Sequence, residues 1–402
     1  MPNETSSDSD VPAYPFGPVV ALDLHPRYAE LRRSEPISWV RMPYGGDAWL
    51  ITGYPELKQF LADPRFSSFA ATAPDTPRVT PLPLRPGNLL TMDQPEHSRI
   101  RRVVAKAFTG RQVEKLRPRI GAVVNDLLDQ MEAQGPPADL LTHLAEPVPV
   151  TMICELFGVP YEERGQFRAY SDVFVATHAH SAEEIDHSRN ELERYIIELV
   201  DRRRKNPSDD LASMLLEACE VERITEVEMT RTGLGILMAG HETSLSMIAN
   251  SLYLLLSRPE LYAQICRDPA LISSAIDEML RFIPLRSVGS FPRVATEDVK
   301  IGDVCIRAGQ TVIFQRASAD RDERVFDNPE ELDLTRTPNP NLGFGHGIHY
   351  CLGAPLARLE LQLVLDGLLR RFPSLRLATP AEEVPWKPGL IARCPQALYA
   401  TW

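Results

Sequence analysis

The segment 225–257 predicts a single long helix, and this helix restricts the fold more than any other feature of the sequence. Thr225 followed by Glu228 matches a capping box, in which each residue satisfies a backbone amide of the other at a helix N-terminus. The helix should end before Arg258-Pro259, because the residue preceding a proline disfavours helical geometry. At about 1.5 Å per residue the helix would be roughly 48 Å long, so it must cross the whole molecule.

Helical patterns dominate the rest of the chain. Residues 48–53 read as a strand, and residues 290–315 alternate like short strands joined by glycine-containing turns. Residues 71–90 contain five prolines and predict a long ordered loop, a kind of segment that is often functional. The expected fold is therefore mainly α with a small β portion. Further helices are expected at 55–62, 99–108, 113–133, 148–157, 161–175, 182–204 and 270–282, and from Cys351 to near Phe372.

Composition and charge exclude several classes of protein. The net charge of −12 opposes nucleic-acid binding. The polar, acidic start lacks the features of a signal peptide, and no apolar stretch approaches the ~18–20 residues that span a bilayer. No linker or repeat divides the 402 residues. We expect one cytoplasmic, monomeric domain over residues 1–402, with about residues 1–12 disordered and no contact with membranes or nucleic acid.

Cys351 has unusual neighbours among the six widely spaced cysteines, which predict neither a disulfide framework nor a structural zinc site. It lies in residues 344–355 (FGHGIHYCLGAP), where Pro355 suits the first turn of a helix. The amides and dipole of that helix should lower the pKa of the thiol and give a thiolate able to ligate iron. The alternative is a buried thiol beside a glycine-rich turn. Close approach of a flat ligand is permitted by Gly345, Gly347 and Gly353.

Residues 239–243 (AGHET) lie at the middle of the predicted long helix. The Thr243 hydroxyl can bond to the carbonyl of Ala239, four residues earlier, and leave a notch with a carboxylate, Glu242, nearby. Glycine within a helix costs about 1 kcal/mol relative to alanine, so Gly240 requires a reason. That reason is either close packing or a cofactor lying against the backbone. The alternative for the whole motif is a polar patch within a core helix.

These two motifs resemble those of the cytochrome P450 family. Residues 344–353 match its haem-binding signature FxxGxxxCxG at every fixed position, and residues 239–243 match its oxygen-activation motif AGxET. The resemblance implies the P450 fold, with haem between the long central helix and the helix that follows Cys351, the proximal iron ligand. By the same resemblance Thr243 hydrogen-bonds dioxygen and Glu242 relays protons. The family pattern also places near the haem Phe344, Gly353, Ala239 and Gly240.

Four cationic residues match family positions that hold the haem propionates. In order of weight, they are Arg101, Arg293, His97 and His349. His97 and Arg101 share one helical face because they are four residues apart. The alternative for each is a solvated surface residue, and histidine as the iron ligand is a weaker reading because none occupies the ligand position.

Glu278 and Arg281 match the family's ExxR pair. They lie one helical turn apart and can form an ion pair. The resemblance gives them a structural role together with Arg336, and a generic surface pair is the alternative.

The resemblance predicts a soluble bacterial monooxygenase like those of actinomycete antibiotic biosynthesis. It would hydroxylate or epoxidise a hydrophobic secondary-metabolite intermediate, of polyketide, macrolide or peptide origin. The expected cofactor is haem b (iron protoporphyrin IX), with O2 as co-substrate. Oxidative coupling or ring formation without oxygen insertion is an alternative, and so is a noncatalytic haem sensor, although Glu242-Thr243 argue against the sensor. A peroxide-driven enzyme usually lacks that acid–alcohol pair.

The sequence predicts external redox partners, because no G-x-G-x-x-G follows a strand to bind a nicotinamide or flavin cofactor. Electrons from NAD(P)H should arrive through a ferredoxin reductase and a small acidic ferredoxin. Residues 97–119 hold eight Lys or Arg and one acidic residue, Glu114. Arg102 and Lys106 should share an outward helical face and form the docking site, with an ordinary solvated face as the alternative.

The substrate pocket should draw on several aliphatic segments. His178, His180 and His187 either touch the substrate or are solvated. The pocket segments are residues 71–90, 167–187, 237–240, 288–291 and 389–392.

Overall fold

Two long helices, α10 (Glu226–Leu256) and α14 (Ala354–Arg371), form the centre of the fold. The computed structural model describes residues 11–18, 20–165, 169–170, 173, 181–221, 223–286, 289–388 and 392–402. The expectations for residues 1–10, for His178 and His180, and for much of the predicted helix 161–175 lie outside these residues. Pro12, placed within the expected disordered start, accepts a hydrogen bond from the Arg41 amide at 2.9 Å.

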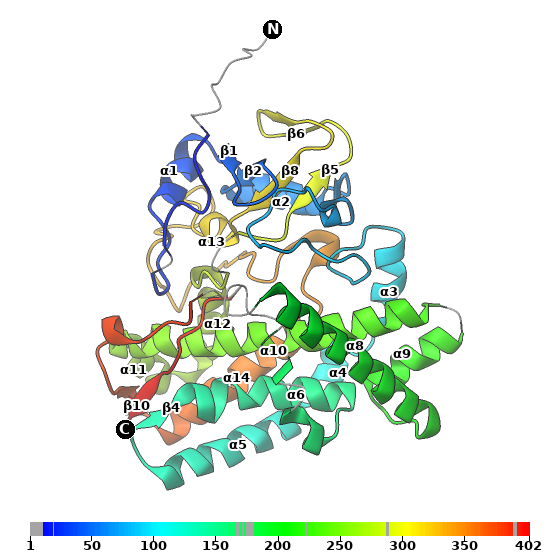
Figure 1. Cartoon of the computed structure of the whole chain (residues 1–402). Coiled ribbons are helices and arrows are strands. Elements are labelled where there is room, and N and C mark those ends of the chain that lie inside the picture. The colour runs from blue at the N-terminus through cyan, green and yellow to red at the C-terminus, as the bar shows by residue number, and fades with distance from the viewer. Residues whose placement is uncertain are drawn as a thin grey trace.

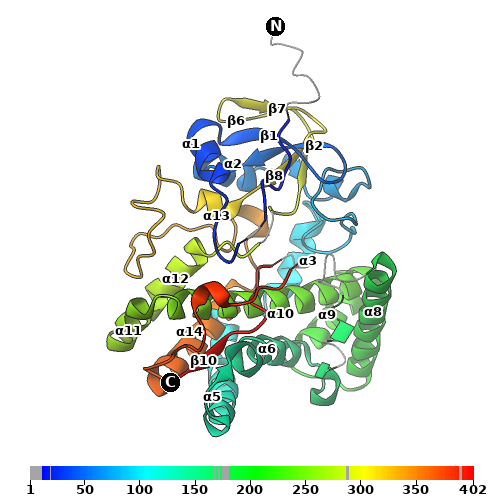
Figure 2. The same cartoon turned by 60° about the vertical axis from the view of Figure 1, so that its left-hand side comes forward.

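Helix α10 confirms the predicted long helix and both of its ends. Thr225 Oγ1 accepts a hydrogen bond from the Glu228 amide at 3.2 Å, and Glu228 Oε2 accepts one from the Thr225 amide at 2.8 Å. The next helix, α11 (Pro259–Arg267), begins at the proline that was expected to stop α10. In both views of the molecule α10 crosses the middle (Figures 1 and 2).

The helices gather below a smaller, strand-rich part of the molecule (Figure 1). The predicted helix 113–133 is interrupted, because Pro118 lies in the first turn of a new helix and has no amide with which to continue the previous one. None of the helices in the described part of the chain is long and apolar enough to cross a membrane. The other helices are α1 (Arg27–Ser34), α2 (Tyr54–Ala62), α3 (Glu96–Val104), α4 (Gly110–Glu114), α5 (Arg117–Gln134), α6 (Pro147–Phe157), α8 (Ala182–Lys205), α9 (Leu211–Glu220), α12 (Ile272–Phe282) and α13 (Arg316–Ala319).

The main sheet has five strands in the order β1-β2-β8-β5-β3, and only β2 and β8 run parallel. A three-stranded sheet has the order β4-β10-β9, and β6 pairs with β7. The predicted strand at 48–53 is thus one of a pair that flanks a tight turn. The strands are β1 (Ile37–Arg41), β2 (Asp47–Ile51), β3 (Phe66–Ser67), β4 (Ala138–Asp139), β5 (Arg293–Ala295), β6 (Val299–Ile301), β7 (Val304–Ile306), β8 (Thr311–Phe314), β9 (Arg376–Leu377) and β10 (Tyr399–Thr401).

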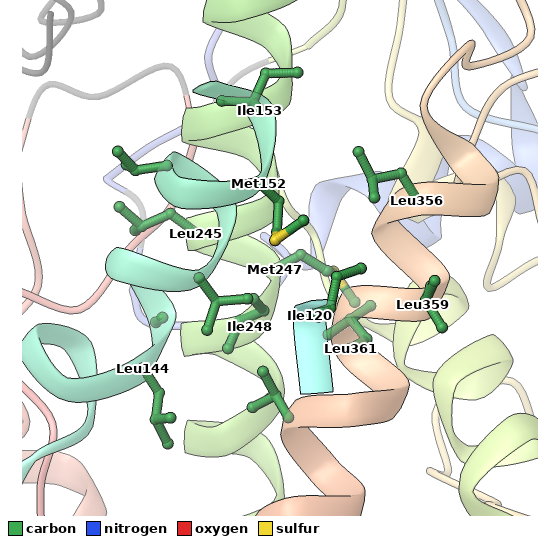
Figure 3. Packing of buried hydrophobic residues seen from close by; sticks show 14 of the residues in the cluster. Ile120, Leu144, Met152, Ile153, Leu245, Met247, Ile248, Leu356, Leu359 and Leu361 are labelled. Carbon is green, nitrogen blue, oxygen red and sulfur yellow. The ribbon is translucent and has the colours of Figure 1, made fainter. Parts of the chain in front are cut away.

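The main hydrophobic core lies where α10 meets α5, α6 and α14 (Figure 3). Leu245 and Ile248 of α10 approach Met152 of α6, while Leu356 and Leu359 belong to the facing side of α14. This packing fixes the separation between α10 and the start of α14, and the cysteine loop immediately precedes that start.

Candidate haem-thiolate site

The cysteine loop is held between α2 and the N-terminus of α14. The Cys351 amide donates to the carbonyl of Phe344 at 2.9 Å, which closes the loop. A Cβ on Gly347, whose φ is +73°, would lie 2.4 Å from the carbonyl oxygen of Leu61 at the end of α2, so this position requires glycine. A Cβ on Gly353 would meet nothing within 4 Å. The loop therefore packs on one side and leaves open space beside the cysteine.

The Cys351 thiol does not have the lowered pKa that the helix N-terminus predicted. Burial raises its pKa, and this effect outweighs the backbone amides of Gly353 and Ala354, which donate to the sulfur, and the positive charges of Arg316 and Arg101. The predicted geometry is present, but the loss of hydration of a thiolate is the larger effect. A metal ion that binds this sulfur would have to displace the thiol proton.

A cationic cluster, formed by His97, Arg101, Arg293 and His349, brings together the four residues expected at the propionates. The rings of His97 and His349 have centroids 4.4 Å apart. Arg101 donates to the carbonyl of Tyr350, the residue next to Cys351. The cluster joins α3, β5 and the cysteine loop, which are far apart in the sequence.

The two arginines of the cluster, Arg101 and Arg293, carry charges of the same sign. Burial, together with the charges of Arg101 and Arg293, lowers the pKa of His97 to about 4 and that of His349 to about 3. Both ring nitrogens of His97 are buried and have no hydrogen-bond partner among the described residues. Asp93 is near, but its carboxylate accepts hydrogen bonds from Ser67 and from the amides that follow.

Arg293 is a further buried cation without an anionic partner among the described residues. Burial lowers its pKa to about 10, and its guanidinium lies 5.3 Å from the ring centroid of Phe60. It forms no ion pair with any residue that the structure describes. Buried cations are costly unless they are paired. The cluster therefore fits a ligand that carries two negative charges, as the haem propionates do.

The middle of α10 presents a polar edge. Thr243 Oγ1 donates to the Ala239 carbonyl at 2.6 Å, which confirms the predicted back-bond. Ala239 and Thr243 are exposed although they lie midway along the longest helix. A Cβ on Gly240 would lie 2.6 Å from Cδ1 of Ile153, so close packing against α6 is a sufficient reason for this glycine. Glu242 raises the pKa of Cys394, which places its carboxylate near the C-terminal segment.

The proline-rich loop of residues 73–90 lies against the same helix. Arg231 Nη1 donates to the carbonyl of Pro86 at 3.1 Å, and a Cβ on Gly235 would lie 3.7 Å from Cβ of Asn88. The loop contains no helix or strand in the described structure. It is therefore placed to cover the part of α10 that precedes Thr243.

The Glu278–Arg281 pair is fully buried, with an N–O distance of 2.7 Å, and is not a generic surface pair. Arg336 joins it at 3.1 Å, as expected. Arg281 also donates to the carbonyls of Asp320, Pro329 and Glu331. These contacts tie α12 to the segment that leads into the cysteine loop.

Sequence reasoning missed three charged residues near the site: Glu360, which is buried, and Arg286 and Arg316, which are partly buried. Burial raises the pKa of Glu360 to about 8. Its carboxyl group forms a hydrogen bond with Ser244, the neighbour of Thr243. The signal for Glu360 was a single carboxyl group between the core residues Leu359 and Leu361. The sequence signal for Arg316 was a charged residue two positions after the apolar stretch of residues 312–314.

The open space beside Cys351, the cationic cluster and the exposed edge of α10 together fit a flat group with two carboxylates and a central metal. Haem has this chemistry. These residues therefore fit the class of haem-thiolate proteins.

The chain belongs to the cytochrome P450 family, whose model matches residues 166–268 and 270–391. It is 51% identical over 395 residues to nocardicin C N-oxygenase of Nocardia uniformis subsp. tsuyamanensis, covering 98% of this chain and 99% of that protein. It is 45% identical over 391 residues to mycinamicin IV hydroxylase/epoxidase of Micromonospora griseorubida, covering 97% and 98%. The crystal structure of HinD with NMFT and NO superposes with a TM-score of 0.94 at 44% identity, covering 98% and 99%. The chain is thus a cytochrome P450 monooxygenase.

Proposed function

We propose that the chain is a single cytoplasmic, monomeric haem domain that hydroxylates or epoxidises a hydrophobic secondary-metabolite intermediate. The observation that carries the proposal is the cationic cluster: it contains the buried ring nitrogens of His97, which have no partner among the described residues, and it lies beside Cys351, whose sulfur receives two helix amides. Nocardicin C N-oxygenase and mycinamicin IV hydroxylase/epoxidase, by their names, both transfer oxygen to a natural product, which supports this substrate class.

Each site residue has a proposed task. Haem b, when bound, supplies the activation of O2 for oxygen transfer. Cys351 ligates the iron, and the cationic cluster neutralises the propionates. Thr243 places its hydroxyl beside the reacting oxygen, where it can accept a hydrogen bond while its own proton is donated to Ala239, and Glu242 delivers protons toward that oxygen. Phe344, Gly353, Ala239 and Gly240 shape the walls of the haem pocket, and the loop of residues 73–90 covers the substrate.

Electrons are proposed to come from NAD(P)H through a ferredoxin reductase and an acidic ferredoxin. The docking patch that supports this is smaller than the sequence suggested, because Arg99, Arg117 and Arg119 form ion pairs with acidic residues of the chain. Lys106 lies in the turns beyond the end of α3 and not on the helix itself, because α3 ends at Val104. The docking patch is therefore the exposed set Arg102, Lys106, Arg111 and Lys115.

Product mass tests the proposed reaction. The holoenzyme would be supplied with ferredoxin, reductase, NAD(P)H and ¹⁸O2, and a library of polyketide, macrolide and peptide intermediates would be screened. We expect a product that has gained one labelled oxygen atom. Loss of two hydrogens without label would assign oxidative coupling or ring formation instead, and haem binding without turnover of any library member would favour a noncatalytic protein.

A further inference from the structure

Two inward arginines, Arg286 and Arg316, have no task in the function proposed above. Arg286 lies beyond α12 in a segment whose backbone pairs with Ala392 near the C-terminus. Its guanidinium lies 4.3 Å from the ring centroid of Phe291, and its Nε donates to the carbonyl of Gly289 at 3.2 Å. Arg316 is the first residue of α13, and one residue, Gln315, separates it from the end of β8.

The two arginines are partly buried, their charges interact, and neither has an anionic partner among the described residues. Burial is the main cause that lowers the pKa of both, to about 10 for Arg286, and the charge of Arg316 lowers that of Arg286 further. Neither forms an ion pair within the described part of the chain, and Arg316 forms no side-chain hydrogen bond there.

Asp320 does not neutralise the pair. It attracts Arg316, but its carboxylate accepts a hydrogen bond from the Leu342 amide at 2.7 Å and makes no ion pair with Arg316 in the described structure. Burial also raises the pKa of Asp320 to about 7, so the group is only partly ionised at neutral pH. Two neighbouring, partly buried cations therefore lack an anionic partner among the described residues, an arrangement that an anion would stabilise.

We propose that Arg286 and Arg316 bind a carboxylate of the substrate. The planar, forked guanidinium matches a carboxylate with two hydrogen bonds, and both side chains keep accessible surface from which to make them. Arg316 lies near enough to Cys351 for their charges to interact, so the anion would be held close to the reacting centre. The substrate is then an amphipathic acid, such as a peptide- or acyl-derived intermediate, and not a neutral macrolide.

A haem propionate is the competing source of a carboxylate. The two propionates already have the four groups of the cationic cluster, which include the partnerless nitrogens of His97. This is why the proposal assigns the arginine pair to the substrate. The inference rests on the proposed haem site, and its test must separate the two.

The experiment uses a series of imidazole-terminated alkanoic acids of graded chain length and their methyl esters, titrated into the holoenzyme by Soret shift. The imidazole binds the iron in both, so acid and ester differ only at the far carboxylate. A hydrogen-bonded charge pair predicts that the acid of optimal length binds about 10–100-fold more tightly than its ester. Arg286→Gln and Arg316→Gln should each remove most of this preference and leave ester affinity unchanged. Arg307→Gln, which removes an exposed arginine that pairs with Asp298 outside the site, is the control.

Equal affinity of acid and ester at every chain length in the parent protein would overturn the inference, whatever the variants do. A glutamine variant with lowered haem occupancy, whose haem-containing fraction keeps the parent's preference for the acid, would assign the pair to a propionate and overturn the inference as well. Arg286→Lys and Arg316→Lys retain the charge, and should keep part of the preference even if the glutamine variants fold poorly. Failure of the parent to bind haem would overturn the proposed function itself, a result that the haem absorbance reports before any ligand is added.

Discussion

Single residues at this site show the cost of buried polar and charged groups that have no partner among the described residues. His97 is 1% exposed, and both its ring nitrogens have no partner in the described structure. Arg101 and Arg293 surround it with positive charge. Such a group of residues is unfavourable for folding alone and becomes favourable when a dianionic ligand binds.

Removal of one cluster cation should weaken haem binding. Arg101→Leu or Arg293→Leu leaves a propionate underpaired, which costs about 1–3 kcal/mol. We expect a higher rate of haem transfer to apomyoglobin in both variants. Arg102→Leu is the matched control, because this neighbour of Arg101 is exposed. Parent-like haem loss in both variants would remove the propionates from this cluster.

The hydroxyl of Thr243 should matter after O2 binds and not before. Its bond to Ala239 holds it at a fixed place on α10. Thr243→Ala should keep haem and substrate binding but lower the product formed per NAD(P)H by about tenfold or more, with hydrogen peroxide released instead. Thr243→Ser should retain most of the coupling. Unchanged coupling in Thr243→Ala would rule out a role for the hydroxyl.

Local rules predicted the residues whose behaviour depends on nearby sequence. The Thr243 back-bond spans four residues, and the capping box of Thr225 spans three. The pKa of Cys351 could not be predicted in this way, because burial by the whole fold outweighs two local amides. Arg286 and Arg316 were missed because their proximity is created by the tertiary structure.

At the scale of elements, α10 and α14 meet through a protonated carboxyl group. Glu360 of α14 is 1% exposed and is bonded to Ser244 of α10. Sequence signals at helix ends, such as Pro259, predicted the limits of α10. The strand order could not be predicted, because β2 pairs in parallel with β8, more than two hundred residues later.

The Glu360 contact predicts a pH-dependent stability. In the folded chain the Glu360 carboxyl group stays protonated up to about pH 8. In the unfolded chain it ionises near its ordinary pKa. The folded parent protein is therefore destabilised as the pH rises from that ordinary pKa to about 8. At about 1.4 kcal/mol per pH unit, the upper limit between pH 6 and 8 is roughly 3 kcal/mol. Urea unfolding should show a smaller loss for Glu360→Gln. Asp366→Asn, on the same helix, should follow the parent, and parallel pH profiles of Glu360→Gln and parent would contradict the account.

At the scale of the whole molecule, the proposed redox partner, a ferredoxin, is acidic like the chain itself. The net charge of −12 repels an acidic partner. The exposed docking patch attracts such a partner locally, through Arg102, Lys106, Arg111 and Lys115. Electrostatic steering acts mainly on the rate of encounter and fades beyond about 8–10 Å at physiological salt.

Reversal of two patch charges should therefore slow electron delivery. Arg102→Glu with Lys106→Glu should reduce ferredoxin-supported turnover, most at low salt, and leave substrate binding and peroxide-driven turnover intact. Arg376→Glu with Lys387→Glu makes the same charge change near the C-terminus, at exposed positions. Identical ferredoxin kinetics for the two double variants across a salt series would show that docking occurs elsewhere.

The ligation of haem iron by Cys351 is the central claim, and the absorption spectrum of the reduced carbon monoxide complex tests it most directly. The parent and Cys305→Ser, which changes an exposed cysteine, should both show the band of thiolate-ligated haem. Cys351→His should bind haem without that band, because imidazole replaces the thiolate. Retention of the thiolate band in Cys351→His would contradict the account.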